Sequence, residues 1–463
     1  MRTDHIHCIG IGGIGVSALA RLYQSRGWLV SGSDLARSEI TDALTKEGIR
    51  VFIGKHNRKH ILLSVTRVVY SVAVRRDNPE LREARRRGVP CLSYAEAVGE
   101  LTREFKTIAI AGSHGKSTTT AMAALMMAKA GLNPTVIVGT KLKEFGGTNF
   151  RSGRSPWLVL EADEYRASFL NYTPAIAVIT NIDREHLDFY RSIRAIEATF
   201  LKFLSRLAPN GTAVLNRDDH RLRRIGGRLA RRRPDIRVIW YSLQSPAARR
   251  IATVIRIPGR HNVANALAAH AAGRTLKIPA RMILAAIHAY RGAWRRFDYQ
   301  GLFALRGTSG QSGAKVFADY AHHPTEIKAT LQAAREKFPR RRIWCVFQPH
   351  HYERTHDLFG EFSRAFSDCD TLILLDIYEV AGRERKRKSP QVSSERLARA
   401  VSRNGTPAIY LANPQRLQPF LAKCLRASDI LLMMGAGSIW KMTKDLLRPQ
   451  KKQRAQTAHG SIR

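Results

Sequence analysis

Short apolar runs, each followed by a turn and a longer segment rich in alanine and leucine, recur along the chain. The run at residues 6–9 leads into Gly10, the run at 107–111 leads into Gly112, and a third run covers 315–318. Apolar runs this short are typical of buried strands, and their alternation with helical segments indicates parallel α/β sheets. The pattern therefore predicts an α/β fold.

The second of these runs leads into the strongest chemical motif of the chain, Gly112-Ser113-His114-Gly115-Lys116-Ser117. Residues 118–130 are helix-forming and are followed by Gly131, so the motif lies between a strand and a helix. Glycines let backbone N–H groups approach phosphate oxygens, and the helix N-terminus favours negative charge. The spacing is shorter than that of the full phosphate-loop pattern, but the lysine and serine are those that bind phosphate and Mg²⁺. ATP and Mg²⁺ are the predicted cofactors.

Two further apolar runs end in polar residues. The run at 157–160 ends in Glu161-Ala162-Asp163-Glu164, and the run at 176–180 is followed by a loop that contains His186. A carboxylate at the end of a strand beside a phosphate loop is well placed to bind Mg²⁺. We expect Glu161 to do so and His186 to hold a second cation. The alternative for both segments is a solvated loop.

A second glycine-rich motif, Gly10-Ile11-Gly12-Gly13-Ile14-Gly15, stands between the first run and a predicted helix at 16–25. Asp34 follows the next strand, where a ribose-binding acid belongs. The motif specifies only a pyrophosphate held at a helix N-terminus. NAD and other nucleoside diphosphates both satisfy it.

The places where the pattern restarts divide the 463 residues into three domains. We predict a Rossmann-like N-terminal domain at 1–103 and a central domain with a P-loop ATPase-type parallel sheet at 104–297. A Rossmann-like C-terminal domain follows at 298–447, and its first long strand comes soon after a glycine- and serine-containing stretch at 307–313. The tail at 448–463 is basic, lacks acidic residues and is predicted to be disordered.

Composition excludes several classes of protein. A hydrophobic fraction of 44% and a charged fraction of 25% are those of ordinary globular chains. No apolar run is long enough for membrane insertion, and the N-terminus lacks a signal-peptide pattern. The five cysteines are scattered and form no CxxC pair, which favours a reducing compartment over a disulfide framework or structural zinc. We expect a cytoplasmic protein.

The formal net charge of +40 has two interpretations. Such a charge is typical of nucleic-acid-binding proteins, and it is equally compatible with an enzyme whose substrates are polyanions. The basic clusters at 231–233, 340–342 and 383–388 lie far apart and are not interleaved with aromatic residues. We therefore expect no specific nucleic-acid partner.

Taken in order, these motifs resemble the Mur ligase family, and within it the branch that adds alanine. The resemblance covers residues 5–445. Its further motifs are Ser31-Gly32-Ser33-Asp34, Thr180-Asn181-Ile182, His186-Leu187-Asp188, Pro258-Gly259-Arg260-His261-Asn262-Val263-Ala264-Asn265, Arg295-Arg296-Phe297-Asp298, Asp319-Tyr320-Ala321-His322-His323-Pro324-Thr325-Glu326, Gln348-Pro349-His350 and Gly435-Ala436-Gly437-Ser438-Ile439.

The resemblance implies an ATP-dependent ligase that joins L-alanine to the lactyl carboxylate of UDP-N-acetylmuramate through an acyl phosphate, in peptidoglycan precursor synthesis. It makes the first domain the UDP-sugar site, the second the ATP site and the third the amino-acid site. The implied catalytic residues are Lys116, Glu161, His186 and Arg296, with Ser117, Glu161 and His186 at the metal ions. The implied ATP-binding residues are Gly112, Ser113, His114, Gly115, Lys116, Ser117, Thr118, His261, Asn262, Asn265, Arg296 and Asp319. The implied UDP-sugar residues are Gly10, Gly12, Gly13, Gly15, Ser33 and Asp34, and the implied amino-acid residues are His323, His351 and Arg354.

The sequence departs from the family pattern at three places. Trp294 replaces a small residue before the arginine pair, His351 replaces an arginine, and residues 379–386 replace an acidic, proline-containing loop. The last two changes lie in the predicted amino-acid domain, so a sister ligase that attaches a preformed peptide remains an alternative. An NAD-dependent oxidoreductase and a basic nucleic-acid-binding protein are further alternatives, and the pair Lys116-Ser117 disfavours the oxidoreductase. We expect a monomer or a weak homodimer.

Overall fold

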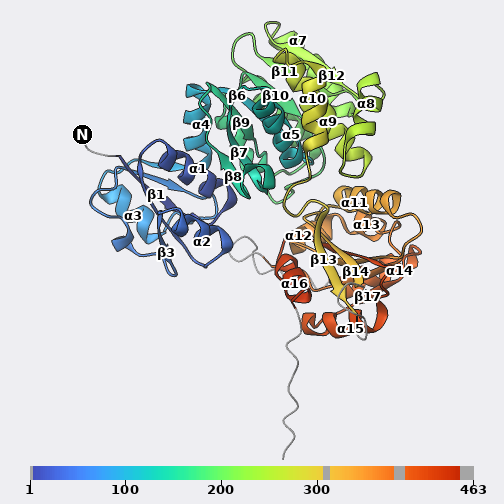
Figure 1. Ribbon diagram of the computed structural model, residues 1–463. Coiled ribbons are helices and arrows are strands. Elements are labelled where there is room, and N and C mark those ends of the chain that lie inside the picture. Colours follow the sequence, from blue (N-terminus) through green and yellow to red (C-terminus); the bar gives the residue numbers. More distant parts are fainter. Residues whose placement is uncertain (1–3, 306–312, 380–391, 449–463) are drawn as a thin grey trace, which may run out of the picture.

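The computed structural model describes residues 4–305, 313–379 and 392–448. It contains three β-sheets that follow one another along the chain, each covered by helices and each at the centre of one domain (Figure 1). The three-domain α/β prediction is confirmed. Three sequence predictions lie outside the described residues: the segment at 383–388, nearly all of the stretch at 307–313, and the tail except for Arg448.

The N-terminal sheet is parallel throughout and has the strand order β3-β2-β1-β4-β5. Its elements are β1 (His5–Ile9), α1 (Ile14–Ser25), β2 (Leu29–Asp34), α2 (Glu39–Lys46), β3 (Arg50–Ile53), η1 (Arg58–His60), β4 (Arg67–Tyr70), α3 (Pro79–Arg86), β5 (Cys91–Ser93) and α4 (Tyr94–Glu104). The glycine motif spans the turn from β1 to α1, and Asp34 ends β2, as the sequence predicts.

The middle sheet has the order β12-β11-β10-β6-β9-β7-β8, and β8 runs antiparallel to β7 at its edge. Its strands are β6 (Lys106–Ala111), β7 (Thr135–Leu142), β8 (Thr148–Arg151), β9 (Trp157–Glu161), β10 (Ile176–Ile179), β11 (Thr212–Asn216) and β12 (Arg237–Tyr241). Its helices are α5 (Lys116–Lys129), η2 (Lys143–Phe145), η3 (Tyr165–Asn171), α6 (Ile193–Leu204), α7 (His220–Arg232), α8 (Pro246–Val254), α9 (Arg260–Thr275) and α10 (Ala280–Ala289).

Both faces of the middle sheet are buried, because successive side chains of a strand point to opposite faces. In β6, Ile108 and Ile110 join a core formed with α5, α9 and α10, whereas Ala109 and Ala111 join the core on the other face. The alanine-rich sequences of α5 and α9 let these helices pack closely on the sheet and on each other.

The C-terminal sheet has the order β13-β14-β18-β15-β16-β17, and only β13 runs antiparallel to its neighbour. Its strands are β13 (Asp298–Ala304), β14 (Gly313–Asp319), β15 (Ile343–Phe347), β16 (Thr371–Leu374), β17 (Ala408–Tyr410) and β18 (Ile430–Met434). Its helices are α11 (Pro324–Lys337), α12 (Tyr352–Asp357), α13 (Phe359–Ser363), α14 (Ser394–Arg403), η4 (Pro414–Arg416), α15 (Leu417–Cys424) and α16 (Ile439–Leu446).

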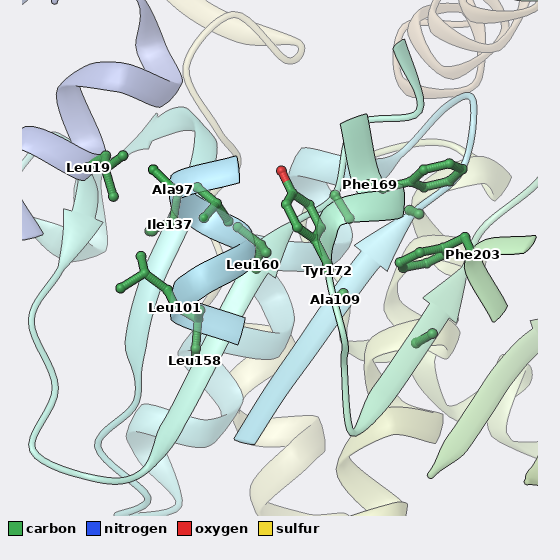
Figure 2. Packing of buried hydrophobic residues seen from close by; sticks show 14 of the residues in the cluster. Leu19, Ala97, Leu101, Ala109, Ile137, Leu158, Leu160, Phe169, Tyr172 and Phe203 are labelled. Atoms are coloured by element: carbon green, nitrogen blue, oxygen red, sulfur yellow. The ribbon is translucent and has the colours of Figure 1, made fainter. Parts of the chain in front are cut away.

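One apolar core continues from the N-terminal domain into the middle domain. Figure 2 shows Ala97 and Leu101 of α4 beside Leu158 and Leu160 of β9, with Leu19 of α1 nearby. All five side chains are at most 1% exposed. The two domains are therefore joined by the same kind of packing that holds each of them together.

Within the described residues, no helix is both long enough and apolar enough to cross a membrane.

Candidate active site

The phosphate loop lies between β6 and α5, at the carboxyl end of the middle sheet. Gly112 and Gly115 have φ angles of 132° and 82°, which L side chains rarely adopt. A Cβ atom at Gly112 would lie 2.0 Å from the hydroxyl of Thr180, and one at Gly115 would lie 2.2 Å from the side chain of Asn265. Only glycine fits at these two places, so the loop keeps its backbone N–H groups open to a ligand.

Lys116 begins α5 and is held by a carboxylate that the sequence analysis did not single out. Its ammonium group donates to Glu164 at 2.8 Å and to the carbonyl oxygen of Gly112 at 2.7 Å. Burial opposes the charge of this lysine, but the neighbouring carboxylates, Glu164 foremost, outweigh burial and raise its pKa. Lys116 is therefore a cation that is already positioned at the phosphate loop.

Ser117 and Glu161 meet beside it. The Ser117 hydroxyl donates to Glu161 at 2.9 Å, and the backbone N–H of Gly139 donates to the same carboxylate at 2.7 Å. Burial raises the pKa of Glu161. A second group of possible ligand atoms belongs to Asp163, Glu164 and His186, which lie within 4.8 Å of one another. His186 sits 3.5 Å from Glu164. The predicted metal residues are thus neighbours at one end of the sheet.

A cleft of about 360 Å³ separates the middle and C-terminal domains next to the phosphate loop. Its walls come from both domains and contain nine of the predicted ATP residues: His114, Gly115, Ser117, Thr118, His261, Asn262, Asn265, Arg296 and Asp319. Burial, reinforced by Arg296, lowers the pKa of His261 to about 4, so this ring is neutral at pH 7. A neutral, half-apolar wall suits a nucleobase.

Asp319 closes this cleft from the C-terminal domain. It ends β14 and accepts hydrogen bonds from the N–H groups of Phe297 and Ala321, each at 2.7 Å. Burial raises its pKa to about 6. The aspartate therefore also fixes the segment that carries the chain from the middle to the C-terminal domain.

In the N-terminal domain, Asp34 accepts a hydrogen bond from the N–H of Gly12 at 2.9 Å, so it braces the glycine turn. Ser33 is buried, and its hydroxyl donates to the buried carboxylate of Glu80 at 2.6 Å. Glu80 is also bonded to His60 at 2.7 Å. In this structure the hydroxyl of Ser33 thus faces the interior of its own domain.

A second and larger cleft beside the phosphate loop, about 590 Å³, is lined by residues of all three domains. The N-terminal domain contributes Gly15 and Tyr94, and the middle domain contributes, among others, Lys116, Ser117, Glu161, Asp163 and His186. The C-terminal domain contributes His322, His350, His351 and Arg354. A volume of this size is typical of a small-molecule site. The structure thus gathers predicted residues of all three kinds of site around one space.

Arg354, on α12, extends into this cleft and pairs with Glu185 at 2.6 Å. The carboxylate of Glu185 is 5% exposed, and its pKa lies well below the ordinary value because Arg354 and nearby histidines outweigh its burial. His351 lines the same cleft. Both ring nitrogens of His323 are already engaged in hydrogen bonds within the protein. One accepts from the N–H of Thr325, and the other is bonded to the carbonyl oxygen of Arg184.

Trp294 packs against Trp440 of α16 with ring centroids 5.4 Å apart, and Lys141 lies over its ring. This tryptophan therefore contacts both the C-terminal domain and β7 of the middle domain. Sequence reasoning missed the carboxylates Glu164, Glu185 and Glu326 as partners of site residues. Glu164 and Glu326 lie within the motifs named above and Glu185 directly precedes one of them, but their partners are brought to them only by folding.

Comparison with known families agrees with this organisation. Residues 5–106 match the model of the Mur ligase family catalytic domain, 110–273 that of the Mur ligase middle domain, and 295–437 that of the Mur ligase glutamate ligase domain. These three matches follow the three sheets.

Individual proteins give a similar result. The UDP-N-acetylmuramate–L-alanine ligase of Symbiobacterium thermophilum is 40% identical and covers 96% of this chain and 94% of its own length. That of an Anaeromyxobacter species is 42% identical, with 96% and 98% covered. The solved UDP-N-acetylmuramate–alanine ligase of Thermotoga maritima has a TM-score of 0.76 at 26% identity and covers 96% of this chain and 98% of its own. The chain belongs to the Mur ligase family.

Proposed function

We propose that the protein is an ATP-dependent ligase that joins L-alanine to the lactyl carboxylate of UDP-N-acetylmuramate through an acyl phosphate. In this proposal residues 1–103 bind the UDP-sugar, 104–297 bind ATP, and 298–447 bind the amino acid. The observation that carries it is the cleft shared by the three domains, with Gly15, Lys116 and Arg354 on its walls. Relatives that cover nearly the whole chain are UDP-N-acetylmuramate–L-alanine ligases, which supports the same reaction.

The first step transfers the γ-phosphoryl group of ATP. An oxygen of the lactyl carboxylate attacks the γ-phosphorus, the bond to the β-phosphate oxygen breaks, and ADP leaves. Negative charge gathers on the transferred oxygens, and fixed cations stabilise that charge. Lys116 offers its ammonium from the phosphate loop, and Arg296 lines both clefts. Glu164 holds Lys116 in place until phosphate oxygens take over its hydrogen bonds.

The second step forms the amide bond. The unprotonated amine of L-alanine attacks the acyl carbon, and the carbon–oxygen bond to phosphate breaks. Inorganic phosphate leaves with one former carboxylate oxygen and takes up the proton that the amine nitrogen loses. Arg354 binds the carboxylate of the amino acid, because a guanidinium presents parallel N–H donors to a carboxylate. Glu185 orients that guanidinium by its hydrogen bond at 2.6 Å.

The donor groups near the phosphate loop fit Mg²⁺. Carboxylate and hydroxyl oxygens are the ligands that this ion prefers, and it usually takes a few of them together with phosphate oxygens. Ser117 and Glu161 would hold one ion, and His186 with the carboxylates beside it a second. When bound, Mg²⁺ neutralises charge on the phosphates. The free state of all five cysteines suits the cytoplasmic location that we propose.

Phosphate release tests this function. The purified protein is given ATP, Mg²⁺ and UDP-N-acetylmuramate, and the acceptor is varied among L-alanine, glycine, L-serine and an alanine-headed tripeptide. We expect phosphate release to require the UDP-sugar and to be fastest with L-alanine. Release that is faster with the tripeptide would replace this proposal by the peptide-adding alternative, and release without the UDP-sugar would contradict both.

A further inference from the structure

The side chain of His114 points out of the phosphate loop, toward two carboxylates of different domains. Its Nε2 lies 3.0 Å from Asp183, which follows β10 in the middle domain. Its Nδ1 lies 3.4 Å from Glu326, in the first turn of α11 in the C-terminal domain. Burial disfavours a charged ring, but these two carboxylates outweigh it and raise the pKa of His114 to about 10. The ring is therefore an imidazolium that bridges two domains.

A bound cation is a poor explanation of this cluster, although atoms of His114, Glu185 and His323 lie within 4.8 Å of one another. The Nδ1 of His323 accepts a hydrogen bond from the N–H of Thr325, and its Nε2 donates to the carbonyl oxygen of Arg184. The His323 ring thus has no lone pair left for a metal ion. The histidine imidazolium itself compensates the two acids.

Other contacts join the same two segments. The hydroxyl of Thr325 donates to Asp183 at 2.7 Å, and His323 reaches the backbone of Arg184 at 3.1 Å. His323 and Thr325 belong to the start of α11, and the other two residues belong to the loop after β10. The start of α11 is therefore fastened to the loop that also holds His114.

The backbone of His114 is tied just as closely to the middle domain. Its N–H donates to Asn181 at 2.9 Å, and its carbonyl oxygen accepts from Thr180 at 2.6 Å. The backbone of Gly112 packs so closely on Thr180 that a Cβ atom at this position would lie 2.0 Å from its hydroxyl. A displacement of the imidazole is therefore passed to the backbone that presents Lys116.

The segment that connects the two domains has the features of a hinge. Arg295 and Phe297 have φ angles of 58° and 48°, which cost energy for residues other than glycine. Gly292 nearby has a φ of 105°. Domain hinges consist of a few loop residues of this kind, whose backbone angles change when one domain rotates against another. The contacts of His114 lie across the interface that this hinge opens and closes.

We infer that His114 is a positioning residue, which sets the phosphate loop for phosphoryl transfer only when the C-terminal domain has closed on it. The inference rests on the proposed function. It assigns the imidazole side chain to domain coupling, whereas the backbone N–H and carbonyl oxygen of the same residue are held by Asn181 and Thr180 of the middle domain. Domain closure and the rate of the chemical step are thus linked through one side chain.

The test combines small-angle X-ray scattering with steady-state kinetics on the full-length protein. His114→Asn removes the charge, and Glu326→Gln and Thr325→Val weaken the same junction from the C-terminal side. His220→Asn, on the exposed start of α7, is the matched control. Scattering is recorded with and without a non-hydrolysable ATP analogue and Mg²⁺, so it does not depend on the acceptor.

We expect the analogue to make the wild-type protein and the control more compact, and His114→Asn less so. The kcat of His114→Asn should fall about tenfold, as for one charge-assisted hydrogen bond, while KM for ATP stays within about threefold. The kcat of the double variant His114→Asn/Glu326→Gln should be no lower than that of the slower single variant, because both changes break the same junction. Wild-type compaction and kcat in His114→Asn, or losses that multiply in the double variant, would overturn the inference.

The same data separate the two proposals. If the wild-type protein fails to join L-alanine to the UDP-sugar but the junction variants still lose compaction, the proposed function is wrong and the role of His114 in closure stands. If His114→Asn is poorly folded, Thr325→Val decides, because its side chain lies on the surface of α11. Unchanged compaction in a folded Thr325→Val would then contradict the inference.

Discussion

The two junctions between domains differ in chemistry, one being apolar and the other ionic and polar. The N-terminal and middle domains share an apolar core in which Leu101 and Leu160 are at most 1% exposed. The middle and C-terminal domains meet beside the nucleotide cleft through charged and polar groups, of which His114, Asp183 and Glu326 are the centre. Apolar packing is lost as a whole when surfaces part, whereas ionic contacts can exchange with water and ligands.

This difference indicates which part of the enzyme moves. We expect the first junction to keep the N-terminal domain fixed to the phosphate loop, and the second to let the C-terminal domain open to admit nucleotide and close for reaction. Breaking the first junction should therefore reduce stability, and breaking the second should reduce the rate.

The largest effect is expected from the apolar junction. Leu101→Ala should lower the free energy of unfolding by about 2–5 kcal/mol, because it removes buried methyl groups and leaves a cavity against β9. Denaturant unfolding of the full-length protein measures it. The matched control is Leu63→Ala, at a side chain that is 94% exposed, which should change stability by less than about 0.5 kcal/mol. Equal losses in the two variants would show that the first junction is not a shared core.

Lys116→Ala should reduce the ligation rate by about a hundred- to a thousandfold, because it removes a fixed cation from the transferring phosphoryl group. It also leaves the buried Glu164 without its lysine, so the rate is referred to folded protein, measured by circular dichroism. Lys129→Ala, at the exposed end of the same helix, should keep the wild-type rate. A Lys116→Ala rate above about a tenth of wild type would contradict the assigned role.

Arg354→Ala should raise KM for L-alanine about ten- to a hundredfold, which corresponds to one charge-assisted hydrogen bond. KM for ATP should barely change, because Arg354 is not among the residues that line the cleft proposed for ATP. Arg354→Lys keeps the charge and loses the planar guanidinium, so its KM for L-alanine should lie between those of the wild type and Arg354→Ala. If KM for L-alanine is unchanged in Arg354→Ala, the carboxylate is bound elsewhere and the peptide-adding alternative gains support.

The smallest effect near neutrality is that of pH, and its sign separates the junctions. The pKa of His114 rises from 6.5 to about 10 in the folded protein. The stability that its ion pairs contribute to the closed junction is therefore complete below pH 6.5 and is lost as the pH rises through about 10. Burial raises the pKa values of Asp183 and Glu326, but nearby histidines, chiefly His114 for Asp183 and His322 for Glu326, outweigh burial. Both pKa values therefore lie below the ordinary 3.8 and 4.5, and the contributions of these carboxylates to stability are lost only in acid. His322 and His323, whose pKa values burial lowers, add no charge at pH 7.

Compaction by the ATP analogue should therefore be greatest below about pH 6.5 and weaken progressively as the pH rises toward about 10. Leucine side chains carry no proton, so the apolar junction should not follow this curve. Small-angle scattering across this range measures compaction, and His114→Asn should flatten its alkaline limb. An alkaline limb that is the same in His114→Asn would show that another group titrates.

Sequence alone was sufficient where a site is formed by one strand and the turn after it. The turn that holds Gly112, the position of Lys116 at the start of α5 and the carboxylate of Asp34 at the end of β2 all follow from local pattern. These features depend on neighbouring residues in the chain, so spacing describes them well.

Sequence was insufficient where the partner comes from another element. The pairing of Arg354 with Glu185 joins residues of two domains, and that of Lys116 with Glu164 joins α5 to the segment after β9. Ser33 shows the same limit, because the motif places it near the UDP-sugar and packing turns its hydroxyl to Glu80. The antiparallel edge strands β8 and β13 were not predicted either, since edge position depends on the assembled sheet.

Isotope transfer can show directly whether the reaction passes through an acyl phosphate. UDP-N-acetylmuramate labelled with ¹⁸O in its lactyl carboxylate is converted with ATP and L-alanine, and the released phosphate is analysed by mass spectrometry. We expect each phosphate to carry one labelled oxygen, because the oxygen that attacks the γ-phosphorus leaves with it. Product formation with unlabelled phosphate would contradict an acyl phosphate and require a different activation of the carboxylate.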